Sequence, residues 1–252
     1  MSVNFRVRST CVTHTGLVRA ANEDSALVRE EAQVWVVADG MGGHANGQWA
    51  SQTVVSAIRA ATLKGEFEPD VNGLIDAIQA ANSHIFQAAQ ETGRSMGSTA
   101  VALYLCGDQF ACVWAGDSRI YLLRAGQLYL ITRDHTQVQE MVDRGILTPE
   151  EAVNHPMSHV LSRAVGVQGE LQLEATADQA LPRDVFLLCS DGLTGVVSEP
   201  EIADRLSHFN GDAACGRLLD LVLSRGAPDN VTMIAVACEE ATALTFLAPT
   251  AS

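Results

Sequence analysis

The order of apolar and polar residues predicts a strand at the start of the chain and two long helices after it. Residues 5–13 alternate with a period of two, which is typical of a strand. Apolar residues then recur at helical spacing from about residue 47 to residue 61, and again from 71 to 89. Residues 64–69 connect these two amphipathic helices, and Gly93 is expected to end the second one.

The middle of the chain is rich in short apolar runs separated by glycine turns. Residues 98–106 and 109–115 flank a Gly-Asp turn, and residues 118–124 and 127–131 flank an Ala-Gly turn. Sequential short strands joined in this way predict an antiparallel sheet or two stacked sheets.

The last third of the chain predicts both helices and strands. The apolar runs 185–189 and 231–238 are expected to be buried strands, and residues 198–206 and 212–223 have the spacing of helices. The tail, 241–252, carries no clear pattern, and we expect it to be flexible.

Residues 132–166 form a polar segment between these parts. We expect two short helices within it, and the second should begin with Thr148 as its N-cap and Pro149 in its first turn. We interpret the segment as a flap-like insertion over the core of a single domain, 1–240, and not as an independent domain.

Composition narrows the functional classes. The 252 residues are 47% hydrophobic, so a sizeable core can form, and the formal net charge of −14 argues against sequence-independent nucleic-acid binding, which needs Lys and Arg to neutralise phosphates. No run approaches the roughly 18 apolar residues of a membrane helix. The six cysteines form no C-x-x-C pair, so reduced, buried thiols are expected. These features predict a cytoplasmic protein without membrane insertion.

The candidate chemistry lies where apolar strands end in an aspartate. Asp39, Asp117 and Asp191 each end such a run beside a glycine, and Asp229 precedes one. Taken singly, an Asp-Gly pair is ordinary turn chemistry. A buried carboxylate is costly unless it is paired or binds a metal, and no Lys or Arg neighbours Asp39, Asp191 or Asp229 in the sequence. Together they favour a site for a hard cation such as Mg²⁺ or Mn²⁺.

Eight short motifs occur in the order found in one known family. They are RAANED at 19–24, VADGMGG at 37–43, MGSTA at 96–100, WAGDSR at 114–119, RDHT at 133–136, SRAVG at 162–166, SDGL at 190–193 and PDNVT at 228–232. Each is weak alone, but as an ordered set they resemble the metal-dependent Ser/Thr protein phosphatases of the type 2C (PPM) family, bacterial type.

The resemblance implies an α+β fold, an αββα sandwich of two antiparallel β-sheets flanked by helices. It also implies hydrolysis of phosphoserine and phosphothreonine on proteins by a water activated at a binuclear Mn²⁺ or Mg²⁺ centre. In signalling, such dephosphorylation would oppose a bacterial Ser/Thr kinase. The expected partner is a phosphoprotein substrate, and the chain is expected to be a monomer.

The resemblance further implies a set of metal ligands. Asp39 would bridge two ions. The Gly40 carbonyl would join it on one ion, with Glu23 binding there directly or through water. Asp191 and Asp229 would hold the other ion.

Other positions carry further implied roles. Asp117 matches the position that binds a third, weaker metal, Arg19 matches the arginine that grips the substrate phosphate, and Asp24 would be an outer partner of the metal ligands. Met41 stands where eukaryotic members often have a histidine, so the acid that protonates the leaving oxygen is open. His135 is expected to orient its loop by hydrogen bonds.

Three other interpretations compete with this one. A pseudophosphatase that only binds a partner is the alternative from a different class, but a dead copy would be expected to lose some of the four aspartates. A nucleotide-binding loop at 39–47 would need the Lys-Ser/Thr of a P-loop, which is missing. A serine hydrolase is disfavoured because Ser98 and Ser190 do not lie in G-x-S-x-G.

Overall fold

The computed structural model describes residues 5–43, 45–153, 155–208 and 213–240. The tail that was expected to be flexible, 241–252, lies outside the described residues. Among the described residues, none of the helices is both long and apolar enough to cross a bilayer.

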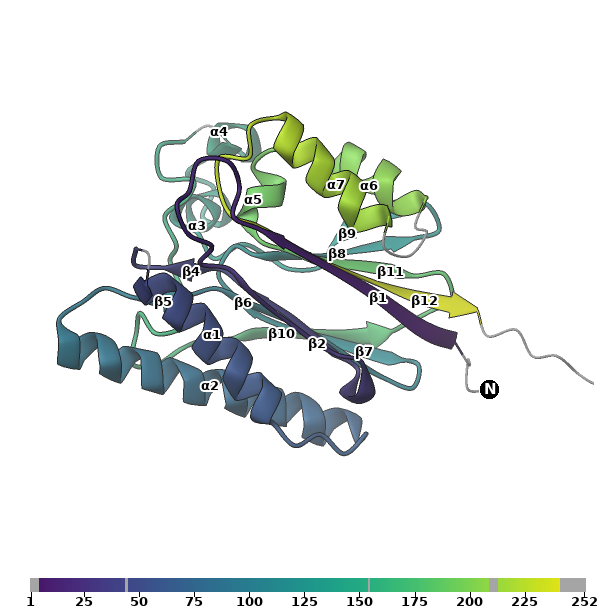
Figure 1. Cartoon of the computed structure of the whole chain (residues 1–252), viewed down its shortest axis with the longest axis horizontal. Helices are drawn as coiled ribbons and strands as arrows, with labels where there is room; N and C mark the ends of the chain where they lie inside the picture. Colours follow the sequence, from purple (N-terminus) through teal and green to yellow (C-terminus); the bar gives the residue numbers. More distant parts are fainter. Residues whose placement is uncertain (1–4, 44, 154, 209–212, 241–252) are drawn as a thin grey trace, which may run out of the picture.

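Two five-stranded antiparallel sheets form the centre of the molecule (Figure 1). The first has the order β1 (Phe5–His14), β12 (Val231–Glu240), β11 (Val185–Cys189), β8 (Arg119–Arg124), β9 (Gln127–Leu130). The second has the order β10 (Glu174–Gln179), β7 (Gln109–Ala115), β6 (Ala100–Cys106), β3 (Val34–Ala38), β2 (Ser25–Arg29). A separate short ladder pairs β4 (Gly40–Met41) with β5 (Gly97–Ser98).

Helices cover the outer face of each sheet, so the order of layers is helix, sheet, sheet, helix (Figure 1). The second sheet is covered by α1 (Ala45–Ala60) and α2 (Phe67–Thr92). The first is covered by α5 (Asp191–Thr194), α6 (Glu199–Ser207) and α7 (Ala213–Ser224). The remaining helical segments are η1 (Glu30–Ala32), α3 (Gln137–Asp143) and α4 (Pro149–Val153). The predicted αββα sandwich is confirmed.

Three apolar clusters hold these layers together. One lies between the two sheets and includes the fully buried Trp35, Leu103 and Phe186, and the other two lie between each sheet and its helices. Strands β3 and β11 are buried along their whole length because both of their faces are covered. This explains why they appear in the sequence as continuous apolar runs that end abruptly in a polar residue.

Some local predictions were incomplete or wrong. The α2 helix begins at Phe67, so Pro69 lies in its first turn and not in the preceding connection. Strand β10 and the single-turn helix α5 were not predicted. All six residues of β10 are at least partly exposed, so it lacks the apolar alternation that marks a strand. The six cysteines are free thiols as expected, but Cys11 is exposed.

The polar segment 132–166 contains α3 and α4, and Thr148 and Glu151 cap the second helix reciprocally, as the N-cap prediction required. A single bridge between Val165 and Ser98 ties its end to the core, and a second bridge, between Thr136 and Leu161, joins its two ends to each other. Whether it acts as a flap stays a prediction.

Candidate metal centre

The ends of four buried elements bring the predicted aspartates to one end of the sandwich. Asp39 follows β3, Asp117 follows β7, Asp191 begins α5 directly after β11, and Asp229 lies two residues before β12. Asp39 interacts electrostatically with all three of the others and with Asp24. The sequence spacing that suggested a shared cation site therefore corresponds to a real cluster in space.

The crowding of like charges shifts the acidity of these groups. Burial, followed by repulsion from Asp24, Asp191, Asp117 and Asp229, raises the pKa of Asp39 well above its usual value. Burial and repulsion from Asp191 raise the pKa of Asp117 to about 7. Burial and Asp229 raise the pKa of Asp191. The raised pKa values mean that the charged forms of these carboxyl groups are disfavoured unless a cation compensates them.

Asp24 lies deeper than the other acids, at 7% exposure. Its Oδ2 accepts a hydrogen bond from Ser190 Oγ (2.8 Å), whose oxygen in turn accepts from the Thr232 N–H (3.0 Å). Burial raises the pKa of Asp24 to about 6. Its other carboxylate oxygen, Oδ1, is buried and has no hydrogen-bond partner in the structure. An unsatisfied buried oxygen of this kind calls for a positive partner or a water.

The backbone of Asp39 is held from both sides by residues of the MGSTA motif. The Asp39 N–H donates to Thr99 Oγ1 (2.9 Å), and the Thr99 N–H donates to the Asp39 carbonyl (2.8 Å). Ser98 Oγ also donates to that carbonyl (3.0 Å), and Thr99 Oγ1 lies 2.7 Å from Ser118 Oγ. The motif is visible in the sequence, but its role, which is to fix where the Asp39 carboxylate points, depends on these contacts in the fold.

Two glycines allow Glu23 to approach the Asp39 turn. A Cβ on Gly40 would lie 2.1 Å from the Gly47 carbonyl oxygen and 2.6 Å from that of Glu23. A Cβ on Gly47 would lie 1.9 Å from Glu23 Oε2, so any side chain there would displace the carboxylate. The structure therefore brings Glu23 against Gly40, the two groups that the resemblance assigned to one ion.

Arg19 corrects an inference made from the sequence. Asp229 has no cationic neighbour along the chain, yet Arg19 Nη2 lies 2.7 Å from Asp229 Oδ2. This hydrogen bond raises the pKa of Arg19, which also interacts with Glu23 and Asp191. The Arg19 side chain remains 56% exposed, so a charged guanidinium stands at the mouth of the acidic cluster.

Asn230 ties the Arg19 loop to the Asp229 loop. Its Oδ1 accepts a hydrogen bond from the Glu23 N–H (2.9 Å), and its Nδ2 donates to the carbonyls of Thr15 (2.8 Å) and Ala21 (2.9 Å). The sequence contains this residue within the PDNVT motif, but its positioning role could be recognised only from contacts across more than 200 residues.

His135 orients the loop before Asp117, as predicted. The ring Nδ1 of His135 accepts a hydrogen bond from the Gly116 backbone N–H (3.1 Å), and the backbone N–H of His135 donates to the Gly116 carbonyl (2.9 Å). Burial lowers the pKa of His135, which favours the neutral ring with its proton on Nε2. That Nε2 lies 3.2 Å from Glu174 Oε1.

The family model described as protein phosphatase 2C matches residues 18–220, which include most of the elements that form this cluster. The chain belongs to the protein phosphatase 2C family.

Similar proteins include several bacterial members of the protein phosphatase 2C family. Serine/threonine protein phosphatase PstP of Mycobacterium tuberculosis is 42% identical over 237 residues, which are 92% of this chain and 45% of that protein. The chain therefore spans less than half the length of that relative. The serine/threonine phosphatase stp of Listeria welshimeri is 34% identical over 234 residues, 89% of this chain and 93% of the relative.

Solved structures of similar proteins have the same fold. PppA of Pseudomonas aeruginosa, described as a key regulatory component of T6SS, superposes with a TM-score of 0.87 at 43% identity and covers 94% of this chain and 99% of its own. The PstP catalytic domain, described in complex with two manganese ions, has a TM-score of 0.82 at 37% identity and covers 92% of this chain and 98% of its own.

The donor set of this protein phosphatase 2C chain suits hard cations, because carboxylates and a backbone carbonyl are oxygen ligands. Among the described residues, no group of three or more His, Cys, Asp or Glu side chains is arranged as a metal-ligand set by itself. Mg²⁺ keeps several of its waters and is held by few protein carboxylates, and Gly40 would contribute a carbonyl and not a side chain.

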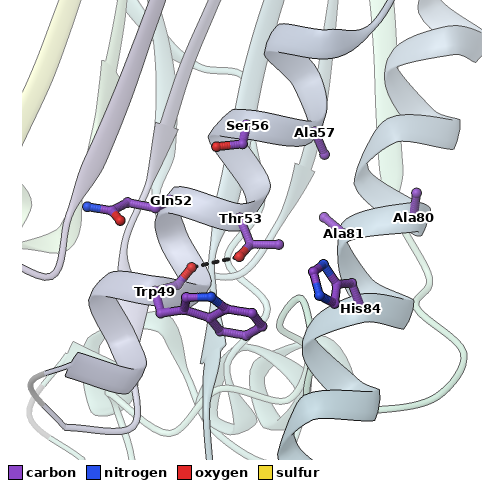
Figure 2. Close-up of a pocket in the computed structure, with 8 residues that line it drawn as sticks. All are labelled: Trp49, Gln52, Thr53, Ser56, Ala57, Ala80, Ala81 and His84. Atoms are coloured by element: carbon purple, nitrogen blue, oxygen red, sulfur yellow. Dashed lines mark hydrogen bonds between the residues drawn. The ribbon is translucent and has the colours of Figure 1, made fainter.

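A separate groove between α1 and α2 does not share this chemistry. It has a volume of about 480 Å³, and the rings of Trp49 and His84 meet edge to face across it at 5.4 Å (Figure 2). The described residues that line it include no carboxylate, arginine or lysine. The described lining of this groove therefore lacks the carboxylates and the arginine that the Asp39 cluster brings together.

Proposed function

We propose that this chain hydrolyses phosphoserine and phosphothreonine on proteins and needs Mn²⁺ or Mg²⁺ to do so. The observation that carries the proposal is the crowding of four aspartates around Asp39, next to one exposed arginine. Phosphate esters are anions, so this acidic cluster would repel them unless cations were present. The names of the similar bacterial proteins, and the two manganese ions described for PstP, support the same conclusion.

The residues present fit two core ions and a third. Asp39 would bridge the core ions, with Gly40 and Glu23 on one side and Asp191 and Asp229 on the other. The third ion would lie at Asp117. When bound, divalent cations neutralise phosphate charge and lower the pKa of water, so that it can attack phosphorus at neutral pH.

The chain's own contribution is to aim and hold these groups. Thr99 and Ser98 fix the Asp39 backbone, and Ser190 orients Asp24 by a 2.8 Å hydrogen bond. Asn230 holds the loop that carries Arg19. Interactions of this supporting kind commonly change metal affinity or activity by about 10- to 100-fold when they are removed.

Arg19 would bind the substrate phosphate. Its guanidinium carries a fixed positive charge and a planar fork of donors that matches phosphate oxygens. The 2.7 Å contact with Asp229 keeps this fork beside the predicted metal ligands. Substrate phosphate would share the guanidinium with Asp229 or displace it from that contact.

The remaining expectations concern the setting of the reaction. A Ser/Thr kinase as the opposing enzyme, a monomeric state and a cytoplasmic location stay predictions. The pseudophosphatase alternative is not favoured, because Asp39, Asp117, Asp191 and Asp229 are all retained in one cluster and the relatives are named as phosphatases.

Activity on a phosphothreonine peptide during a Mn²⁺ titration tests the proposal. Turnover should rise with Mn²⁺ and fall to background in excess EDTA, and p-nitrophenyl phosphate should show the same dependence. Turnover that is undiminished in excess EDTA would contradict the metal-dependent mechanism. No turnover of either substrate with Mn²⁺ or Mg²⁺ would favour the pseudophosphatase alternative.

A further inference from the structure

Leu17 and Val18 are adjacent apolar residues that stand far out from the surface. Val18 is 71% exposed and Leu17 is 63% exposed, whereas most other exposed large apolar side chains in the described part of the chain lie between 38% and 48%. Single exposed apolar residues are common and need no explanation. Two neighbours at such exposure, directly before Arg19, are less ordinary because they form one apolar surface beside a charged site.

The backbone under this pair is anchored on both sides to the Asp229 loop. Before the pair, Gly16 packs so closely that a Cβ there would lie 2.2 Å from the Asp229 carbonyl oxygen. Within it, the Leu17 N–H donates to the Ala227 carbonyl (2.9 Å). After it, Arg19 pairs with the Asp229 carboxylate at 2.7 Å. The exposure of Leu17 and Val18 is therefore built into a fixed loop and is not the result of a loose chain end.

The position of the pair limits what it can contact. Consecutive Cα atoms are about 3.8 Å apart, so the backbones of Leu17 and Val18 lie within about 8 Å of the Arg19 Cα. Gly16, directly before the pair, packs on the Asp229 backbone, and the Arg19 guanidinium contacts the Asp229 carboxylate, so the pair lies beside the group that would hold phosphate.

From this geometry we infer that Leu17 and Val18 determine substrate specificity by contacting an apolar side chain one or two residues from the phosphorylated residue of a phosphopeptide. This inference rests on the proposed function, because it takes the Arg19 site as the place where phosphate binds. Burial of apolar surface between this pair and the peptide side chain would make peptides with an apolar residue at that position better substrates.

The test compares three phosphothreonine peptides that differ only at the positions flanking the phosphothreonine, which carry Leu, Gly or Asp. With wild-type protein and Mn²⁺, kcat/KM should be about tenfold higher for the Leu peptide than for the Gly or the Asp peptide, because neither of these offers an apolar side chain. Tenfold is the lower end of what one apolar group contributes in an enclosed pocket, and this surface is open.

Variants locate the source of the preference. In the double variant Leu17→Ala, Val18→Ala, the ratio of kcat/KM for the Leu peptide to kcat/KM for the Gly peptide should fall to about one. In Val18→Ile, which retains an apolar side chain, this ratio should stay at the wild-type value. Leu181→Ala is the matched control. Leu181 is also an exposed leucine, at 40%, but it lies before the start of β11, whereas Asp191 lies after the end of that strand. The control should keep the wild-type ratio. Thermal unfolding of each variant checks that the fold is intact.

The outcomes separate this inference from the proposed function. Hydrolysis of all three peptides at equal kcat/KM by wild-type protein would overturn the specificity role and leave the phosphatase activity standing. A preference that survives unchanged in the double variant would also overturn it. Failure of wild-type protein to hydrolyse p-nitrophenyl phosphate with Mn²⁺ would instead remove the proposed function, and this inference with it.

Discussion

Asp39 and Asp70 are aspartates that the fold surrounds in opposite ways. Asp70, in the first turn of α2, is 2% exposed and accepts hydrogen bonds from Tyr104 Oη (2.6 Å) and from the N–H groups of Lys64, Gly65 and Glu66 (2.7–3.0 Å). Burial raises the pKa of Asp70, but these donors outweigh it, and the net pKa lies below the usual value.

The Asp39 side chain is surrounded by other carboxylates, whereas the Asp70 side chain is surrounded by hydrogen-bond donors. Burial and four like charges raise the pKa of Asp39, and its hydrogen bonds with Thr99 and Ser98 involve its backbone and not its carboxylate. A carboxylate supplied with donors stabilises the fold, whereas one placed among carboxylates costs stability until something positive arrives. The difference distinguishes an aspartate whose charge the fold stabilises, Asp70, from one whose charge the fold disfavours, Asp39.

The largest expected effect comes from removing the charge of Asp39. Asp39→Asn should lower turnover of p-nitrophenyl phosphate by more than about 100-fold, because removing even an indirect supporting partner of a metal site costs up to that factor. Without metal, Tm should stay the same or rise, since the substitution relieves repulsion. Near-normal turnover, or a marked loss of Tm, would place Asp39 with the structural aspartates.

Asp70→Ala should show the opposite combination. Four donors would lose their acceptor, and the free energy of unfolding should fall by about 3 kcal/mol in denaturant titrations. Turnover per folded molecule with saturating Mn²⁺ should change little, because the α2 start is not part of the Asp39 cluster. If Asp70→Ala lost activity but kept its stability, the assignment of Asp70 as a stabilising residue would be wrong.

The two variants should also differ in how their stability depends on pH in the presence of a chelator. The folded pKa of Asp70 lies below its unfolded value near 3.8, so its stabilisation is complete above pH 3.8 and is lost as pH falls through the folded pKa. The deficit of Asp70→Ala should therefore shrink in acid.

Asp39 should show the reverse trend, because its folded pKa is raised. Its destabilising contribution is absent below pH 3.8 and grows as pH rises towards the folded pKa, because in that range the unfolded chain loses this proton while the folded chain keeps it. The Tm advantage of Asp39→Asn over wild type should therefore grow with pH. Parallel Tm profiles for both variants would contradict the assigned pKa directions.

Much of the fold followed from patterns within the sequence. Strands buried on both faces, such as β3 and β11, appear as unbroken apolar runs, and α2 ends at Gly93, whose φ of 64° is left-handed and suits glycine. Strand β10 was missed because it lies at a sheet edge and is stabilised by backbone pairing to β7, which leaves no apolar alternation to read.

The site was predictable as a set of strand ends, but its supporting contacts were not. The Asp229 pairing with Arg19 joins residues 210 positions apart, and no local pattern encodes it. Thr99 has apolar neighbours in the sequence. It bonds to Asp39 because β6 begins beside the point where its antiparallel neighbour β3 ends. Asp70 looks like any acid in a first helical turn until Tyr104 of β6 is placed beside it.

Thermal unfolding with and without Mn²⁺ tests the central claim most directly, that the crowded carboxylates around Asp39 are a site for divalent cations. A ligand that binds only the folded state at 100 times its Kd stabilises it by about 2.7 kcal/mol. Addition of Mn²⁺ after removal of metal by a chelator should raise the Tm of wild type by several degrees and that of Asp39→Asn much less. An equal rise in both proteins, or none in wild type, would contradict the claim.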